Sequence, residues 1–234
     1  PHQDLFKEYT TALKYSYSME KSCYSYLIQG TCLNNLGLSY LYSGNSQKAL
    51  DCFSESLKII KSCGYDESRS HNNIGTAYCM IGDYQMAKLS FETASKLQKN
   101  DPFMIKCISS NLALALYKTN CKDQAIDLVD KIIHEFHENK DCISDTVVYC
   151  SALINKGFFF FSEGDFENAE KYYNESLFHK YRASDDKYRR KRLGMIKLSN
   201  NLETPESSII DLTDLGSNLF YKPYSVVPFA FYVI

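Results

Sequence analysis

The sequence predicts an all-α protein built from repeated pairs of helices. Three observations support this fold class: a segment that recurs along the chain, a turn signal inside each copy, and a regular pairing of small with large residues. Such self-similarity is typical of repeat proteins, in which each unit buries its apolar face only against its neighbours.

The recurring segment is clearest in LGLSYLYSGNSQKAL (36–50) and IGTAYCMIGDYQMAK (74–88). Two further copies follow, LALALYKTNCKDQAI (112–126) and KGFFFFSEGDFENAE (156–170), and the third copy is the weakest. The copies recur about every 40 residues, which is the length of a unit made of two helices.

The first helix of each copy carries a small residue and, three positions later, a large one. The small residues are Gly37, Gly75, Ala113 and Gly157, and the large ones are Tyr40, Tyr78, Leu116 and Phe160. A turn is predicted next, at Gly44-Asn45, Gly82-Asp83, Asn120-Cys121 and Gly164-Asp165. Gly and Asn tolerate the left-handed backbone conformation that ends a helix.

The second helix of each copy has an alanine near its start and a bulky residue four positions later. The alanines are Ala49, Ala87, Ala125 and Ala169, and the bulky residues are Phe53, Phe91, Val129 and Tyr173. We expect small residues to face large ones, so that neighbouring helices approach closely.

The predicted elements then follow in chain order. Residues 1–20 contain the second helix of an incomplete pair; complete pairs occupy 21–62, 63–98, 99–137 and 138–181; a capping helix spans 182–202. The remaining segment, 203–234, is an apolar tail in which two prolines prevent one long helix. Three interpretations of the tail stay open: a cap on the last pair, a segment that enters a groove, or a dimer contact or the start of a further domain.

Composition is that of a globular protein, with 44% hydrophobic and 23% charged residues. The net charge of −2 draws the chain neither to nucleic acid nor to anionic membranes, and no apolar run is long enough to span a bilayer. The nine cysteines are scattered without a CxxC pair, which favours free thiols in a reducing, cytoplasmic environment. The chain starts at Pro1 without Met, so an upstream domain is compatible with the sequence.

The paired helices resemble the tetratricopeptide repeat (TPR) over roughly residues 21–181. The spacing is longer than in the usual repeat, and the usual proline after the second helix is replaced only by a late Pro102. The resemblance implies a right-handed α-α superhelix whose first helices line a concave groove.

Asparagine recurs two residues before the small residue of each first helix, at Asn35, Asn73, Asn111 and Asn155. We call these four residues the asparagine ladder. By resemblance this position points into the groove, where a carboxamide can both donate to and accept from the main chain of an extended peptide. We expect alanine at Asn73 or Asn111 to weaken peptide binding with little unfolding; the alternative is that the ladder only bonds neighbouring helices.

Other groove positions would supply specificity. On the first helices of the first two copies they are Thr31, Asn34, Leu38, Leu41, Arg69, Asn72, Thr76 and Cys79. On the first helices of the last two copies they are Cys107, Ser110, Leu114, Tyr117, Ser151, Phe158 and Phe161. Several are apolar, which suits hydrophobic peptide side chains. Arg69 is the cation of this set; it either holds a ligand carboxylate or pairs with Asp66 at the rim.

The longer repeats and the ladder resemble the TPR domains of Gram-positive peptide-pheromone receptors, of the Rap, PlcR and arbitrium-receptor type. The resemblance implies a sensor that binds a short linear peptide or an extended protein segment and acts on DNA only through a domain not present in this chain. The alternative is a generic TPR adaptor for protein partners, and a homodimer is compatible with either. The carboxylate clamp of chaperone-tail TPR domains does not fit, because only Asn73 matches it.

Neither catalysis nor a cofactor is predicted. The sequence lacks a Gly-rich phosphate loop, HExxH and GxSxG. Two interpretations exist for the segment that contains His134, His137, Asp141 and Cys142. A helix end with solvated histidines is favoured over a metal site. The basic cluster KYRRKR (187–192) is interpreted as the outer face of the capping helix rather than a nucleic-acid contact.

Overall fold

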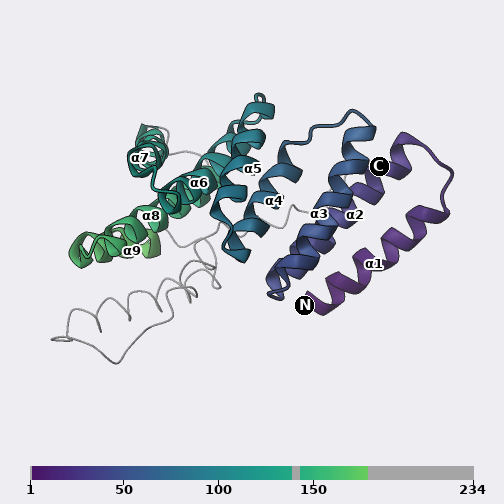
Figure 1. The fold of residues 1–234 in the computed structure, drawn as a ribbon, viewed down its shortest axis with the longest axis horizontal. Helices are drawn as coiled ribbons and strands as arrows, with labels where there is room; N and C mark the ends of the chain where they lie inside the picture. Colours follow the sequence, from purple (N-terminus) through teal and green to yellow (C-terminus); the bar gives the residue numbers. More distant parts are fainter. Residues whose placement is uncertain (1, 139–142, 179–234) are drawn as a thin grey trace. The chain divides into compact units, whose positions relative to one another are not determined.

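The computed structural model describes residues 2–138 and 143–178, and the regular secondary structure within these ranges is entirely α-helical (Figure 1). The helices are α1 (His2–Ser18), α2 (Cys23–Tyr42), α3 (Ser46–Ser62), α4 (Ser68–Ile81), α5 (Tyr84–Leu97), α6 (Pro102–Lys118), α7 (Lys122–Glu138), α8 (Ile143–Ser162) and α9 (Phe166–Phe178). The all-α prediction is confirmed for the described residues. The predicted capping helix, the basic cluster and the apolar tail lie outside them.

The described helices belong to two compact units, which we treat separately. Residues up to Met104 form the first unit, with α1 to α5, and residues from Ile105 form the second, with most of α6 and α7 to α9. In the first unit each helix packs on the next, and α2 also contacts α4. In the second unit α7 packs on α8 and α8 on α9. The handedness predicted for the whole superhelix stays a prediction.

The close approach of paired helices depends on glycine facing an aromatic ring. A Cβ atom placed on Gly37 would lie 2.5 Å from Cε1 of Phe53, and one on Gly75 would lie 2.6 Å from Cε1 of Phe91. The same relation holds in the second unit, where a Cβ on Gly157 would lie 2.7 Å from Cε1 of Tyr173. The predicted pairing of small with large residues is therefore confirmed for α2–α3, α4–α5 and α8–α9.

The third copy uses a different pair of sizes at the same sequence positions. Ala113 on α6 and Val129 on α7 are both completely buried. Where the small residue already carries a methyl group, the sequence has valine in place of an aromatic residue. This change from glycine and an aromatic residue to alanine and valine explains why the third copy matches the other copies less well in sequence. Its core positions are nevertheless kept.

The turn between the helices of each pair has the predicted left-handed residue. The φ angles are +80° at Gly44, +91° at Gly82, +65° at Asn120 and +81° at Gly164. In each case the amide of the following residue donates back to the carbonyl of the large residue of the first helix, for example Asp83 to Tyr78 at 3.0 Å. These bonds satisfy carbonyls that would otherwise be unpaired at the helix end.

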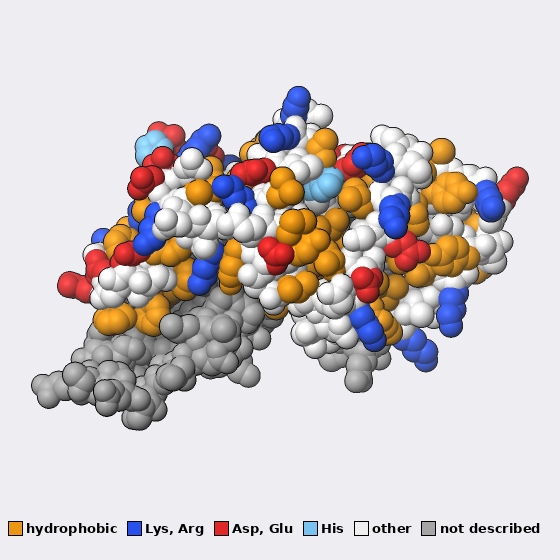
Figure 2. Space-filling view, in the orientation of Figure 1, with side chains coloured by type: hydrophobic (Ala, Val, Ile, Leu, Met, Phe, Trp, Pro, Cys, Tyr) orange, Lys and Arg blue, Asp and Glu red, His pale blue; other side chains and the backbone are white. Residues whose placement is uncertain are grey.

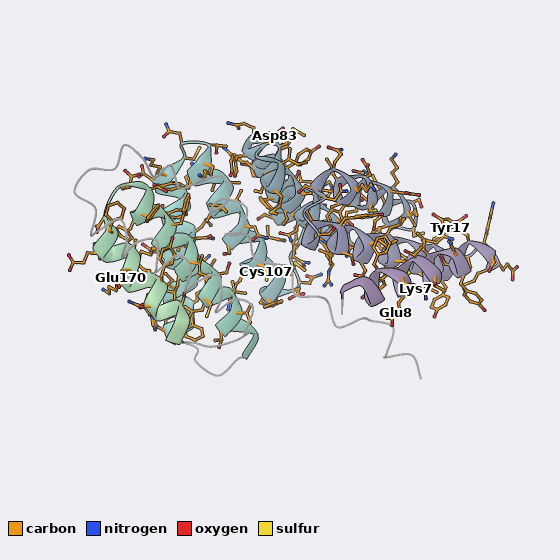
Figure 3. The ribbon with its side chains drawn as sticks, turned by 90° about the horizontal axis from the view of Figure 1, so that it is seen from below. Lys7, Glu8, Tyr17, Asp83, Cys107 and Glu170 are labelled. Carbon is orange, nitrogen blue, oxygen red and sulfur yellow. The ribbon has the colours of Figure 1, made fainter. Side chains whose placement is uncertain are left out.

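The residue after the turn begins the next helix. The side chain of Asn45 accepts from the amide of Lys48, that of Asp83 from Met86, and that of Asp165 from Asn168. Asp83 lies in the connection between α4 and α5 (Figure 3). Turn and cap together keep each connection short, so the two helices of a pair must run back against one another.

We predict that Gly75→Ala lowers the free energy of unfolding by about 1–3 kcal/mol, because the added methyl group overlaps the ring of Phe91. The higher helix propensity of alanine would by itself raise the free energy of unfolding by about 1 kcal/mol. Urea denaturation followed by circular dichroism measures the difference. In a Phe91→Leu background the loss of unfolding free energy caused by Gly75→Ala should be smaller. If Gly75→Ala stabilises the protein instead, the contact between Gly75 and Phe91 does not limit how closely the helices approach.

Candidate functional site

The predicted site residues lie on the first helices of the pairs: α2 and α4 in the first unit, α6 and α8 in the second. All four side chains of the asparagine ladder are buried, with exposed fractions of 8% for Asn35, 3% for Asn73, and 2% for Asn111 and Asn155. Since buried amides need hydrogen-bond partners, their partners decide what the ladder can do.

In the first unit the ladder connects two first helices. Nδ2 of Asn73 on α4 donates to Oδ1 of Asn34 on α2 at 2.8 Å. Nδ2 of Asn72 lies 3.5 Å from Oδ1 of Asn73, at the limit of a hydrogen bond. The amide donor of Asn73 is therefore engaged within the protein.

In the second unit the ladder makes the equivalent connection. Nδ2 of Asn155 on α8 lies 2.9 Å from the main-chain oxygen of Ser110 on α6 and 3.2 Å from its Oγ. The hydroxyl of Ser110 is in turn 3.0 Å from that of Ser151, one turn before Asn155. We call Ser110, Ser151 and Asn155 the polar cluster of α6 and α8.

The two connections share one register. In each, the ladder asparagine of one first helix donates to the residue immediately before the ladder position of the preceding first helix, which is Asn34 or Ser110. The sequence analysis placed both acceptors in the groove. Its alternative for the ladder, bonding between neighbouring helices, did not name these partners. A polar residue before each of the first three ladder positions, inside otherwise apolar helices, was the signal that pointed to them.

These bonds change what the ladder can offer a ligand. The sequence-based hypothesis required each carboxamide to donate and accept at once, but the donors of Asn73 and Asn155 are engaged. Bonding between neighbouring helices is the arrangement expected of the architectural alternative. Contact between the ladder and a peptide stays a prediction.

The remaining predicted residues of the first unit have mixed surroundings. Leu38 is buried in the apolar cluster that contains Phe53 and Ile74. Thr76 donates its hydroxyl to the main-chain oxygen of Asn72 at 3.0 Å. Arg69 is half-buried near the start of α4.

Asp66, the predicted alternative partner of Arg69, accepts from Ser68 and from Gln98. Its Oδ1 accepts from the amide of Ser68 at 2.8 Å, and its Oδ2 accepts from the Ser68 hydroxyl at 3.0 Å and from Nε2 of Gln98 at 3.1 Å. These bonds hold the start of α4 to the end of α5. The role of Arg69 as a ligand contact stays a prediction.

The second unit brings two of the three predicted aromatic residues, Tyr117 and Phe158, together. The ring of Tyr117 stacks on Phe159 with centroids 4.2 Å apart and meets the edge of Phe158 at 5.9 Å. Nζ of Lys118 lies 4.6 Å from the centre of the Phe158 ring, close enough for a cation–π contact. Leu114 is buried on the same helix as Tyr117.

Phe160 and Phe161 pack between α8 and α9. Phe160 stacks on Tyr172 with centroids 5.5 Å apart and is partly buried against the core cluster of Ala169 and Tyr173. Phe161 meets the edge of Phe166 at 5.4 Å in the same cluster. A contact between Phe161 and a peptide stays a prediction.

The Tyr117 hydroxyl takes part in a small charged network. It donates to Oε1 of Glu163 at 2.6 Å, and Nζ of Lys122 lies 2.6 Å from the same oxygen. Burial and this bond to Glu163 raise the pKa of Tyr117 well above its usual value. The hydrogen bonds from Lys122 and Tyr117 hold the pKa of Glu163 below its usual value.

Other kinds of site have little support in the part of the chain that the structure describes. Within it, no group of three or more His, Cys, Asp and Glu residues could hold a metal ion, and no helix is long and apolar enough to cross a membrane. Nδ1 of His134 lies 3.7 Å from Oε2 of Glu138. Asp141 and Cys142, the other two residues of the metal site weighed from the sequence, fall outside the described residues. Figure 2 shows charges of both signs interspersed with hydrophobic side chains on the visible face.

A shallow hollow of about 650 Å³ lies along α1, but it contains none of the predicted site residues. Its described lining comes from that one helix: Lys7, Glu8, Thr11, Ala12 and Tyr15. Lys7 and Glu8 can be located on α1 in Figure 3.

We predict that Asn73→Ala lowers the free energy of unfolding by about 1–3 kcal/mol, because Asn34 loses its partner in a half-buried position. The sequence-based expectation of little unfolding did not include this bond. A double-mutant cycle with Asn34→Ala, measured by urea denaturation, should show coupling between the two residues. Asn174→Ala, at an exposed position on α9, is the control; equal effects of Asn73→Ala and Asn174→Ala would contradict the prediction.

We also predict that Glu163 contributes to stability at neutral pH and loses that contribution in acid. A carboxyl whose pKa is lowered by folding stabilises the protein above its unfolded pKa, and the gain disappears as the pH falls through the folded value. Glu163→Gln should therefore lower the unfolding free energy at about pH 7 and flatten its fall towards about pH 3. Glu167→Gln, an exposed glutamate on α9, is the matched control, and identical pH profiles of the two variants would refute the assignment.

Comparison with known families identifies the repeats. Residues 27–100 and residues 151–177 match models of the tetratricopeptide repeat. Among curated protein sequences, none is significantly similar to this chain.

Solved structures support the same fold. The chain resembles the apo form of the quorum sensor NprR from B. thuringiensis, with a TM-score of 0.65 and 18% identity over 86% of this chain and 56% of that one. It also resembles NprR in complex with its cognate peptide NprX, with a TM-score of 0.67 and 16% identity over 93% of this chain and 60% of that one.

A further similar structure is BtubC (BKLC) from P. vanneervenii, with a TM-score of 0.56 and 14% identity over 88% of this chain and 95% of that one. The chain thus spans less than two thirds of either NprR chain. At sequence identities of 14–18%, the similarity to these structures shows the fold alone. The chain therefore contains tetratricopeptide repeats, at residues 27–100 and 151–177.

Proposed function

We propose that this chain is a peptide-binding TPR domain that holds an extended peptide, or an extended segment of a protein partner, against its first helices. The observation that carries the proposal is the likeness to NprR, both free and bound to its cognate peptide NprX, over most of this chain. A fold shared with a peptide-bound protein supports a peptide ligand. The side chains on the first helices determine which chemical groups of such a ligand would fit.

The first helices of both units combine polar and apolar groups suited to an extended chain. In the second unit the rings of Tyr117 and Phe158 lie beside one another, with the Lys118 ammonium over one of them. In the first unit Arg69 and Thr76 lie on α4 among asparagine side chains. Aromatic side chains with a few polar groups beside them are typical of the lining of sites that bind small ligands and peptides.

The sensor role is the finer part of the proposal. NprR is a quorum sensor, and this chain spans 56% and 60% of the two NprR chains. We propose that the chain is the sensing part of a cytoplasmic peptide-responsive regulator.

A TPR adaptor for protein partners is the second candidate. The bonds of Asn73 to Asn34 and of Asn155 to Ser110 favour it, because they engage ladder donors inside the protein. An adaptor would bind a folded surface and ignore short peptides. A sensor would bind a short peptide with a defined sequence.

Selection from a random library of nine-residue peptides against the full chain tests the proposal. We expect at least one peptide with a dissociation constant of about 1–10 μM by calorimetry, and a scrambled version that does not bind. Lys118→Ala and Arg69→Ala should weaken binding, while Lys171→Ala on the exposed side of α9 should not. If selected peptides bind no tighter than about 1 mM, the peptide-binding proposal fails and the adaptor is favoured.

A further inference from the structure

The second helix of the second pair, α5, exposes apolar side chains along one line. Met86, Leu89, Thr93 and Leu97 follow one another at intervals of three, four and four residues, which places them on one side of the helix. Leu89 is 56% exposed, Leu97 44% and Met86 38%. The hydroxyl of Thr93 donates to the main-chain oxygen of Leu89 at 2.8 Å, so it is satisfied within the helix. We call these four residues the α5 stripe.

The α5 stripe is separate from the face with which α5 packs in the fold. That face consists of Ala87, Ser90, Phe91 and Ala94, which are buried. Phe91 is the ring that faces Gly75 of α4. The core of the first unit therefore does not account for apolar residues in the stripe.

Comparison with the other copies of the repeat shows that the α5 stripe is unusual. At the positions of Leu89 and Thr93, counted from the alanine near the start of each second helix, the other three second helices have charged residues. These residues are Asp51, Asp127 and Lys171 for Leu89, and Glu55, Lys131 and Glu175 for Thr93. The position of Met86 holds Lys48, Gln124 or Asn168. Positions that are polar or charged in the other copies are thus apolar or uncharged in α5.

The flank of the α5 stripe carries one charge of each sign. Glu92 and Lys96 lie on the same flank, one helical turn apart. Lys96 is exposed. The Glu92 side chain is 37% exposed, and its Oε1 lies 4.0 Å from Nζ of Lys88, at the limit of an ion pair. An apolar line with a positive and a negative group beside it is suited to a partner with the same pattern in reverse order.

A second copy of α5 that runs antiparallel, about a two-fold axis at Thr93, presents that reversed pattern. Leu89 of each copy then meets Leu97 of the other, because both lie four residues from the axis. The same flank of both helices is brought together, so Glu92 lies beside Lys96 of the second copy. At 1.5 Å per residue their positions along the helices differ by about 3 Å. Side chains lean towards the N-terminus of their own helix, which brings Glu92 and Lys96 closer and moves the two Glu92 side chains apart.

We propose that the α5 stripe is a contact between two copies of this chain, formed by antiparallel pairing of their α5 helices. The contact goes beyond the proposed function and needs no peptide, because the stripe lies on a second helix and the predicted peptide-binding residues lie on first helices. Each copy contributes the same surface, as in most two-fold dimers. One helix from each copy buries less than the roughly 1,200 Å² of a stable complex, so the association is weak.

Sedimentation equilibrium of the full chain tests the contact. We expect a dimer with a dissociation constant of about 10–100 μM. Leu89→Lys should weaken association by about tenfold or more and leave the fold intact, because α9 has Lys171 at the same position. Tyr24→Lys, at a 54% exposed position on α2, is the matched control and should not change association. A chain that stays monomeric up to about 1 mM, or equal effects of the two variants, would overturn the proposal.

Charge reversal tests the antiparallel arrangement. Glu92→Lys gives the flank two positive groups and Lys96→Glu gives it two negative ones, so each variant alone should associate about fivefold more weakly than the wild type. Mixed in equal amounts, the two variants should form a heterodimer at least as tight as the wild-type dimer, because opposite charges then face each other at both positions. Sedimentation velocity with a fluorescent label on one variant detects the mixed species. A mixture that associates no better than the separate variants would show that the helices do not pair in this way.

Discussion

The contact between a glycine and an aromatic ring is the constraint on which the rest of this structure depends. Gly37, Gly75 and Gly157 each face a ring with no room for a side-chain carbon between them. Such close packing gives these three helix pairs their spacing and brings much apolar area out of water. Burying one aromatic ring completely is worth roughly 1.5–3 kcal/mol, which must offset the cost of glycine inside a helix.

Hydrogen bonds between first helices add a second, more directional constraint. Apolar packing tolerates small sliding between helices, but a buried amide loses its partner when the register shifts. The bonds Asn73–Asn34 and Asn155–Ser110 connect the same two positions in each unit. Each unit therefore has an apolar contact that specifies distance and a polar contact that specifies register.

The hydrogen bonds between first helices also affect what the asparagines can offer a ligand. An asparagine whose donor bonds the next helix can offer a ligand only its acceptor, and Asn155 has that acceptor unpaired. The bonds that hold the helices together therefore limit which groups of any ligand the ladder could contact. Structural and binding roles of the same side chain are compatible, provided that they use different atoms.

The sequence by itself determined the helix pairs, their turns and their apolar contacts. These features depend on neighbours in the chain, such as Gly82 before Asp83, or on a size pattern that repeats, such as Gly75 with Phe91. Only the tertiary structure decided which end of each asparagine is engaged, because the partners Asn34 and Ser110 lie in a different helix pair. A carboxamide has a donor and an acceptor at nearly equal reach, and one sequence letter cannot say which of them the fold uses.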